Sequence, residues 1–173
     1  LKKHIYDLLA GTAGMGNTAI TGDRLVDMPQ VDPFSVDQAY PFGLAHATYT
    51  LSDNLGFDHE SVTAGHLPQS LRPSAIVPDA LVGPAWPAIY TALGSVYSGQ
   101  TPIIEGLLNA VHLDHSIELL VDEARLQSYY GQTVSLTSWA EDYAESSAGR
   151  VVTIHVEHVA SDGTPLAHET ERF

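Results

Sequence analysis

The clearest alternation of apolar and polar residues lies near the C-terminal end of the chain. In GRVVTIHVEHVASDG (149–163), every second residue from Val152 to His158 falls on one side of an extended chain. The turn signal DGTP separates this run from LAHETERF (166–173), which continues as a last strand. An earlier run, GQTVSLTSWAEDYAE (131–145), is rich in Val, Thr and aromatic residues. These segments predict antiparallel strands.

A long segment before these strands has the pattern of a buried helix. VPDALVGPAWPAIYTALGSVYSG (77–99) carries apolar or small residues on several faces, which predicts burial on more than one side. Asp79 can cap this helix or stabilise the partial positive charge at its N-terminus. Pro87 predicts that the regular helix starts late, since proline is tolerated in a first turn, and Gly99 marks its end.

The stretch IIEGLLNAVHLDHSIELL (103–120) is harder to assign. Its apolar positions form no clean helical stripe, so we interpret it as a strand. One face then carries Leu107, Val111, Leu113, His115, Ile117 and Leu119. The opposite face carries His112 and Asp114 among mixed residues, and His115 is assigned to the face toward the helix.

The order of these elements predicts an α+β protein with a hot-dog fold. One long helix is followed by four strands, with one more strand expected around 44–51 ahead of the helix. An antiparallel sheet wrapped around the helix buries the apolar surface of both. We expect residues 1–70 to be an upstream connector or extension and residues 71–173 to be the hot-dog domain.

Composition narrows the function classes. The chain has 173 residues, 44% of them hydrophobic, which suits one ordinary domain with a real core. The absence of cysteine excludes disulfides, thiolate zinc sites and cysteine nucleophiles. A net charge of −14 argues against nucleic acid and anionic membranes as partners. No apolar stretch reaches the ~20 residues of a membrane span, so we expect a cytoplasmic protein.

Three segments in this order resemble a known family. VPDALVGPAWPAIYTALGS (77–95), TPIIEGLLNAVHLDHSIELL (101–120) and GRVVTIHVEHVASDGTPLAHETERF (149–173) are similar to the dehydratase region of bacterial and fungal type I fatty acid synthases. The same order resembles the N-terminal half of MaoC-like dehydratases and hydratases. Such units remove water from a 3-hydroxyacyl chain to give a trans-2-enoyl chain. The resemblance implies no cofactor besides the phosphopantetheine thioester of acyl carrier protein.

The chain departs from the catalytic pattern of that family. One hot dog of the unit carries a catalytic Asp and His spaced as D-x4-H, and another shapes the acyl tunnel without them. Here Asp79 leads to Pro84, Asp114 leads to Leu119, and no Asp is followed by His at the fifth position. We therefore interpret the chain as the non-catalytic hot dog. Its expected partners are the catalytic hot-dog domain of the same synthase and acyl carrier protein.

His112 and Asp114 remain the candidate catalytic residues of the chain itself, because dehydration needs a base and an acid. Two residues apart on a strand, they are ~6.5–7 Å apart at the backbone, so the alternative is that His112 positions a domain interface. Trp86, Tyr90 and His115 are candidates for lining a substrate tunnel. No metal site is expected, since His155 and His158 lie on different strand faces from one another.

Two rival functions stay open from the residues alone. One is a free-standing hot-dog acyl-thioesterase or enoyl hydratase, active as a homodimer and using Asp79, Glu105 or His112. In hot-dog thioesterases a carboxylate near the central helix activates water. The other is a pure assembly module without contact to an acyl chain.

Overall fold

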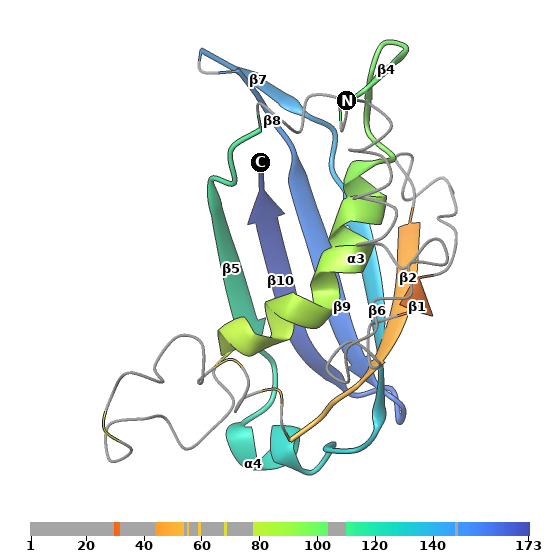
Figure 1. Cartoon of the computed structure of the whole chain (residues 1–173), viewed down its shortest axis with the longest axis vertical. Helices are drawn as coiled ribbons and strands as arrows, with labels where there is room; N and C mark the ends of the chain where they lie inside the picture. The colour runs from red at the N-terminus through yellow and green to blue at the C-terminus, as the bar shows by residue number, and fades with distance from the viewer. Residues whose placement is uncertain are drawn as a thin grey trace.

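The structure is a computed structural model of the chain, and it describes residues 30–31, 44–53, 55, 59, 68, 78–103, 110–147 and 149–173. The helix α3 (Val82–Leu93) crosses one face of a six-stranded sheet (Figure 1). The strands of that sheet are β1 (Gln30–Val31), β2 (Leu44–Thr50), β5 (Asp114–Leu119), β6 (Thr133–Ala140), β9 (Thr153–Ala160) and β10 (Pro165–Arg172). They lie in the order β1-β2-β6-β9-β10-β5, and every neighbouring pair is antiparallel.

Smaller elements complete the described part of the chain. A 3-10 helix, η2 (Pro78–Leu81), leads directly into α3. Two short hairpins are formed by β3 (Tyr97–Ser98) with β4 (Thr101–Pro102) and by β7 (Ala144–Ser146) with β8 (Gly149–Val151). The short helix α4 (Glu123–Gln127) joins β5 to β6, and Asp122 caps it by accepting a hydrogen bond from the Arg125 N–H.

The core lies between α3 and the concave face of the sheet. Alternate residues of β6 and β9 are buried, as the period of a half-buried strand requires. On the helix, Ala85, Ala88 and Ala92 are completely buried, and their small side chains let the helix lie close to the sheet. The buried side chains of Ile89 and Leu93 fill the space between the helix and the sheet. The predicted α+β hot-dog fold is confirmed by this layer arrangement.

The helix starts earlier and ends earlier than the sequence pattern suggests. It begins at Val82, so Pro87 lies inside it rather than opening it. The first four N–H groups of a helix have no partner within it, which is why Pro84 is tolerated there. At the other end the helix stops at Leu93, and Gly94 is its C-cap residue. The N–H of Gly94 donates to the Tyr90 carbonyl (2.9 Å). Gly99 instead has a φ of +62° in the hairpin of β3 and β4.

The stretch 103–120 contains a shorter strand than expected. Residues 104–109 lie outside the described part of the chain, residues 110–113 have no regular structure, and β5 begins only at Asp114. The reason is register: Asp114 pairs with Arg172, the last residue of its neighbour β10. The prediction that Val111 and Leu113 face the helix is wrong, because they are 67% and 53% exposed.

The C-terminal strand predictions are confirmed with one interruption. The run 149–163 is divided at Val152, whose N–H donates to the Phe173 carbonyl (3.0 Å) outside the regular ladder. The strand expected around 44–51 is β2, which pairs with β6 along its whole length. That strand precedes residue 71, where we expect the hot-dog domain to begin, and the division into 1–70 and 71–173 stays a prediction. Among the described residues, no helix is long and apolar enough to cross a membrane.

Candidate functional site

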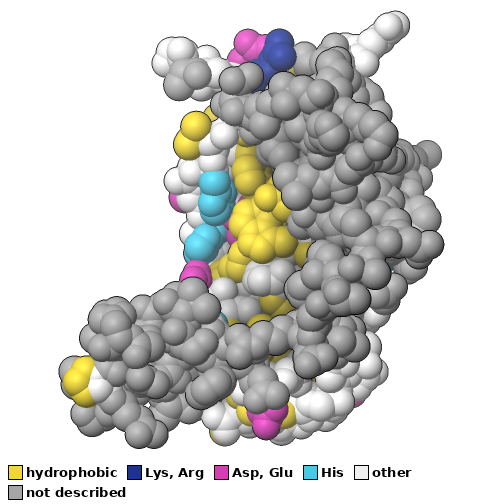
Figure 2. Space-filling model, viewed as in Figure 1, with side chains coloured by type: hydrophobic (Ala, Val, Ile, Leu, Met, Phe, Trp, Pro, Cys, Tyr) yellow, Lys and Arg dark blue, Asp and Glu magenta, His cyan; other side chains and the backbone are white. Residues whose placement is uncertain are grey.

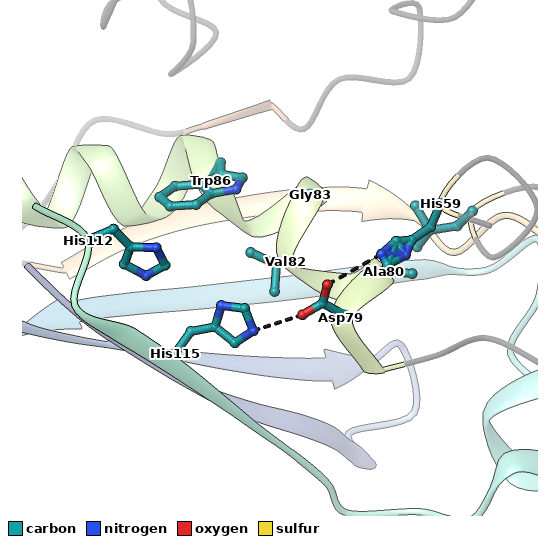
Figure 3. A pocket seen from close by; sticks show the side chains of 9 residues that line it. His59, Asp79, Ala80, Val82, Gly83, Trp86, His112 and His115 are labelled. Carbon is teal, nitrogen blue, oxygen red and sulfur yellow. Dashed lines mark ion pairs between the residues drawn. The ribbon is translucent and has the colours of Figure 1, made fainter. Parts of the chain in front are cut away.

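A pocket of about 470 Å³ opens where η2 and the first turn of α3 meet the start of β5. Figure 2 shows histidine and apolar side chains together in a hollow on this side of the molecule. Figure 3 shows the labelled side chains of the pocket, with Trp86 and Val82 from α3 facing the two histidines near β5. The lining residues are Leu55, His59, Asp79, Ala80, Val82, Gly83, Trp86, His112 and His115.

Asp79 holds two histidines from distant parts of the chain. Its Oδ1 lies 2.8 Å from Nε2 of His115, and its Oδ2 lies 3.3 Å from Nε2 of His59 (Figure 3). The side chain of Asp79 is 53% exposed, so its carboxylate is open to solvent and to a ligand. Sequence reasoning treated Asp79 mainly as a helix cap and did not single out His59, because no local pattern connects them.

His112 is paired with a buried carboxylate from the C-terminal strand. Its Nε2 lies 2.6 Å from Oε2 of Glu171, whose side chain is completely buried. Burial raises the pKa of Glu171, and the hydrogen bond from His112 opposes that rise. Sequence reasoning missed Glu171, although the alternation of LAHETERF places it on the same strand face as Glu169.

The two histidines of the VHLDH stretch lie side by side. His115 is opposite Glu171 in the register of β5 and β10 and therefore shares its helix-facing side. The expectation that His112 belongs to the opposite face is wrong, because His112 precedes the first strand residue and the strand alternation does not apply to it. The ring centroids of His112 and His115 are 5.9 Å apart.

Asp114 does not take part in this cluster. Its carboxylate binds the guanidinium of Arg172, with Oδ1 2.7 Å from Nε, and this contact lowers the pKa of Asp114 and raises that of Arg172. His112 and Asp114 do not pair with each other, in keeping with their separation along the strand, because His112 contacts Glu171 and Asp114 binds Arg172. Any catalytic role of either residue stays a prediction.

Of the two aromatic candidates for a substrate tunnel, Trp86 lines the pocket and Tyr90 packs against Trp86. Trp86 lines the pocket and meets His112 edge-on at 5.8 Å between centroids. Tyr90 stacks on Trp86 at 5.2 Å and does not line the pocket itself, and burial raises its pKa. The two residues pack together as their spacing predicts. Glu105 lies outside the described residues.

One group of side chains in the described part of the chain has the composition of a metal-binding site. His112, His115 and Glu171 each bring one nitrogen or oxygen atom within 4.8 Å of the others. The other His–Glu pairs lie elsewhere. His155 meets Glu141 on the outer side of the sheet (2.9 Å), and His158 lies in the core.

The core histidine lies beside a buried carboxylate and a tyrosine hydroxyl. Nε2 of His158 lies 2.9 Å from Oε1 of Glu169, and both side chains are completely buried. The hydroxyl of Tyr49 lies 3.1 Å from Nδ1 of the same ring. Burial, together with the negative charge of Glu169, raises the pKa of Tyr49. Tyr49, His158 and Glu169 do not line the pocket.

Comparison with known proteins supports the fold. No family model and no curated protein sequence matches the chain. Thioesterase HI1161 from Haemophilus influenzae has a similar structure, with a TM-score of 0.51 and 9% identity over 90% of this chain and 84% of that one. The Escherichia coli PaaI protein of the phenylacetic acid degradation operon gives a TM-score of 0.49 and 17% identity over 98% and 92%. Smu.793 from Streptococcus mutans, bound to acetyl-CoA, gives 0.49 and 11% over 90% and 94%.

At these identities the likeness to thioesterase HI1161 demonstrates the hot-dog fold. The resemblance to the dehydratase region of type I fatty acid synthases stays a hypothesis, because no matching family or relative accompanies it.

Proposed function

We propose that this chain acts on acyl thioesters and that it is an acyl-thioesterase with Asp79 as the group that activates water. The observation that carries the proposal is the position of Asp79. Its half-exposed carboxylate lines the pocket, beside the start of α3, and lies 2.8 Å from Nε2 of His115.

The pocket suits an acyl chain attached to a thioester. Its volume of about 470 Å³ lies within the roughly 300–1,000 Å³ typical of ligand sites. Leu55, Val82 and Trp86 offer apolar walls for the acyl chain, and the histidines and Asp79 line the same pocket. This combination suits a ligand with a hydrocarbon tail and one polar reacting group.

The chemistry follows from the arrangement of Asp79 and His115. The carboxylate accepts a proton from a water molecule while the water oxygen bonds to the thioester carbonyl carbon. The C–S bond then breaks, and the leaving thiolate takes up a proton to give a free thiol and a carboxylic acid. His115 orients the carboxylate through its Nε2. A positioned base of this kind contributes typically ~10²–10⁴-fold to a rate. The name of thioesterase HI1161 supports the same class of substrate.

A second candidate is favoured by the exposed edge of the sheet. In this reading the chain is the non-catalytic hot dog in the 3-hydroxyacyl-ACP dehydratase region of a type I fatty acid synthase, as the resemblance over residues 76–173 implies. β5 forms one end of the six-stranded sheet, and Val111, Leu113 and Leu120 are exposed around it. In the part of the chain that the structure describes, no strand pairs with the outer edge of β5, and such an edge with apolar side chains suits a partner domain. The catalytic hot dog of the synthase would cover it, and acyl carrier protein would deliver the thioester.

One assay separates the two candidates. The whole chain is incubated with acyl-CoA and 3-hydroxyacyl-CoA thioesters, and free thiol and enoyl product are measured. We expect thiol release, with kcat at least ~10²-fold lower in Asp79→Asn because the base is lost. His155→Gln, which removes a histidine from a comparable pair on the outer side of the sheet, is the matched control and should keep full activity.

A second variant tests whether the acyl chain occupies the pocket. Gly83 lines the pocket, and a Cβ added there meets no heavy atom within 4 Å. Gly83→Phe should therefore fold and reduce acyl-thioester turnover by filling the pocket. Thiol release that Asp79→Asn leaves unchanged would contradict the thioesterase proposal. Absence of thiol release, with thioester binding retained and lost in Gly83→Phe, would favour the dehydratase-region candidate.

A further inference from the structure

We propose that His112, His115 and Glu171 form a binding site for one divalent transition-metal ion of the Zn²⁺ type. This inference does not depend on the proposed thioesterase activity. The three side chains come from the segment before β5, from β5 itself and from β10, and one donor atom of each lies within 4.8 Å of the others.

The buried carboxylate is the observation that points to a ligand. The side chain of Glu171 is completely buried, yet only its Oε2 contacts His112. Its Oε1 is buried and has no hydrogen-bond partner among the described residues. Buried carboxylate oxygens are normally satisfied, because an unpaired charge away from water is costly. A bound cation beside Glu171 would satisfy that oxygen.

The donor set has the chemistry of a metal site. Two imidazoles and one carboxylate suit Zn²⁺, Co²⁺ or Ni²⁺, and a cysteine-free chain offers no competing thiolate. Ligand atoms bound to one Zn²⁺ at ~2.0–2.2 Å lie about 3–3.5 Å from each other. To bind one ion, Nε2 of His112 has to move away from Oε2 of Glu171, which it contacts at 2.6 Å, and any donor atoms as far apart as 4.8 Å have to approach one another. His112 and His115 are both 36% exposed at the sheet edge, so a solvent ion can reach them.

Asp79 would support the metal site by orienting His115, without binding the ion itself. Nε2 of His115 contacts Asp79, which leaves Nδ1 of that ring to bind the ion. Metal-bound histidines usually donate their second ring N–H to a carboxylate in this way, which orients the ring. Figure 3 shows His115 between His112 and Asp79, as this role requires. With neutral imidazoles, the two carboxylates of Asp79 and Glu171 also balance the charge of a divalent ion.

The test uses the whole chain after treatment with a chelator. Zn²⁺ is titrated in by calorimetry, and the bound metal per chain is measured by atomic spectroscopy after dialysis. We expect one Zn²⁺ per chain. His112→Gln and His115→Gln should each weaken binding by more than the ~10–100-fold typical of losing an outer supporting residue, and Asp79→Asn by about that range. Co²⁺ should give the visible absorption of a site with nitrogen and oxygen ligands, and this absorption should be lost in both histidine variants.

The controls separate a metal site from histidines that bind metal singly. His155→Gln removes a histidine paired with a carboxylate outside the cluster and should leave Zn²⁺ affinity unchanged. Because Glu171 is buried, Glu171→Gln is first checked for folding by circular dichroism, and the half-exposed histidine variants keep the test independent of it. Less than one Zn²⁺ per chain, or an affinity unaffected by both histidine variants, would overturn the proposal. No acyl substrate is present, so failure of the thioesterase proposal leaves this result unchanged.

Discussion

Two His–Glu pairs lie on the same face of β10, two residues apart, and they differ in their access to water. His158 and Glu169 meet at 2.9 Å with both side chains completely buried under α3. His112 and Glu171 meet at 2.6 Å, with the glutamate equally buried but the histidine 36% exposed at the pocket. The same two residue types therefore form a closed core contact in one place and an accessible contact in the other.

The difference follows from the position of each histidine in the sheet. His158 comes from β9, a central strand covered by the helix, and Tyr49 contacts its second ring nitrogen. His112 comes from the segment just before β5, which is the outermost strand of the sheet among the described residues. A buried pair is hard to open without unfolding, whereas an edge pair can exchange its partner for a ligand. Accessibility, rather than residue type, marks the edge pair as the functional candidate.

The largest expected effect is at the core pair. His158→Leu leaves the carboxylate of Glu169 buried without its partner, which costs about 3–5 kcal/mol of unfolding free energy. Urea unfolding followed by fluorescence measures this loss. The double variant His158→Leu/Glu169→Leu should recover most of it, because replacing both polar side chains leaves neither member of the pair buried without the other. A double variant as unstable as the single one would contradict the prediction, because the loss of stability would then not come from leaving Glu169 without its partner.

A smaller loss is expected at the edge pair. His112→Leu removes the partner of Glu171, but water reaches the position of the exposed ring and replaces part of the contact. The expected cost is about 1–2 kcal/mol, in the range for a buried acceptor that loses its hydrogen bond. The same urea experiment measures it. A loss equal to that of His158→Leu would contradict the distinction between a closed and an accessible pair.

The edge pair should also make stability depend on pH. Burial raises the pKa of Glu171 above its ordinary 4.5, so the folded state holds the proton more tightly than the unfolded chain. The stabilisation from this group is complete below about pH 4.5 and is lost as the pH rises through the folded-state pKa. The side chain that replaces Glu171 in Glu171→Gln cannot lose a proton. The free energy of unfolding, measured from pH 4 to pH 7, should therefore fall less steeply in the variant than in the unmodified chain. Equal slopes would contradict the assignment.

The smallest effect is expected at the solvent-exposed pair of Asp114 and Arg172, which lies on the other side of the same strands. Arg172 lowers the pKa of Asp114, so this contact stabilises the fold above the unfolded pKa and is lost as the pH falls through the folded one. Asp114→Asn should change stability less than any variant above, and the change should shrink in 1 M salt because exposed charges are screened. Thermal unfolding at low and high salt measures both. A salt-independent effect would indicate a buried contribution.

The strands at the end of the chain illustrate what local pattern can predict. The alternation in 149–163 and 166–173 is set by the geometry of an extended chain, so it was readable without a partner strand. The same alternation failed at His112, because the strand begins two residues later, where β10 offers a partner. Pairing partners are a property of the sheet rather than of the segment. A strand boundary set by a neighbour is therefore invisible in the sequence.

The candidate site depends even more on distant contacts. The VHLDH stretch stood out in the sequence, and His112 and His115 do lie at the pocket. Their charged partners come from elsewhere: Glu171 is 59 residues away from His112, and Asp79 lies at the start of the helix. The sequence by itself determined the central helix, the main strands, their order and the hot-dog arrangement, because periodicity and turn residues act over short distances. Only the tertiary structure decided that Asp79, His115, His112 and Glu171 meet, because strand register and helix placement bring them together.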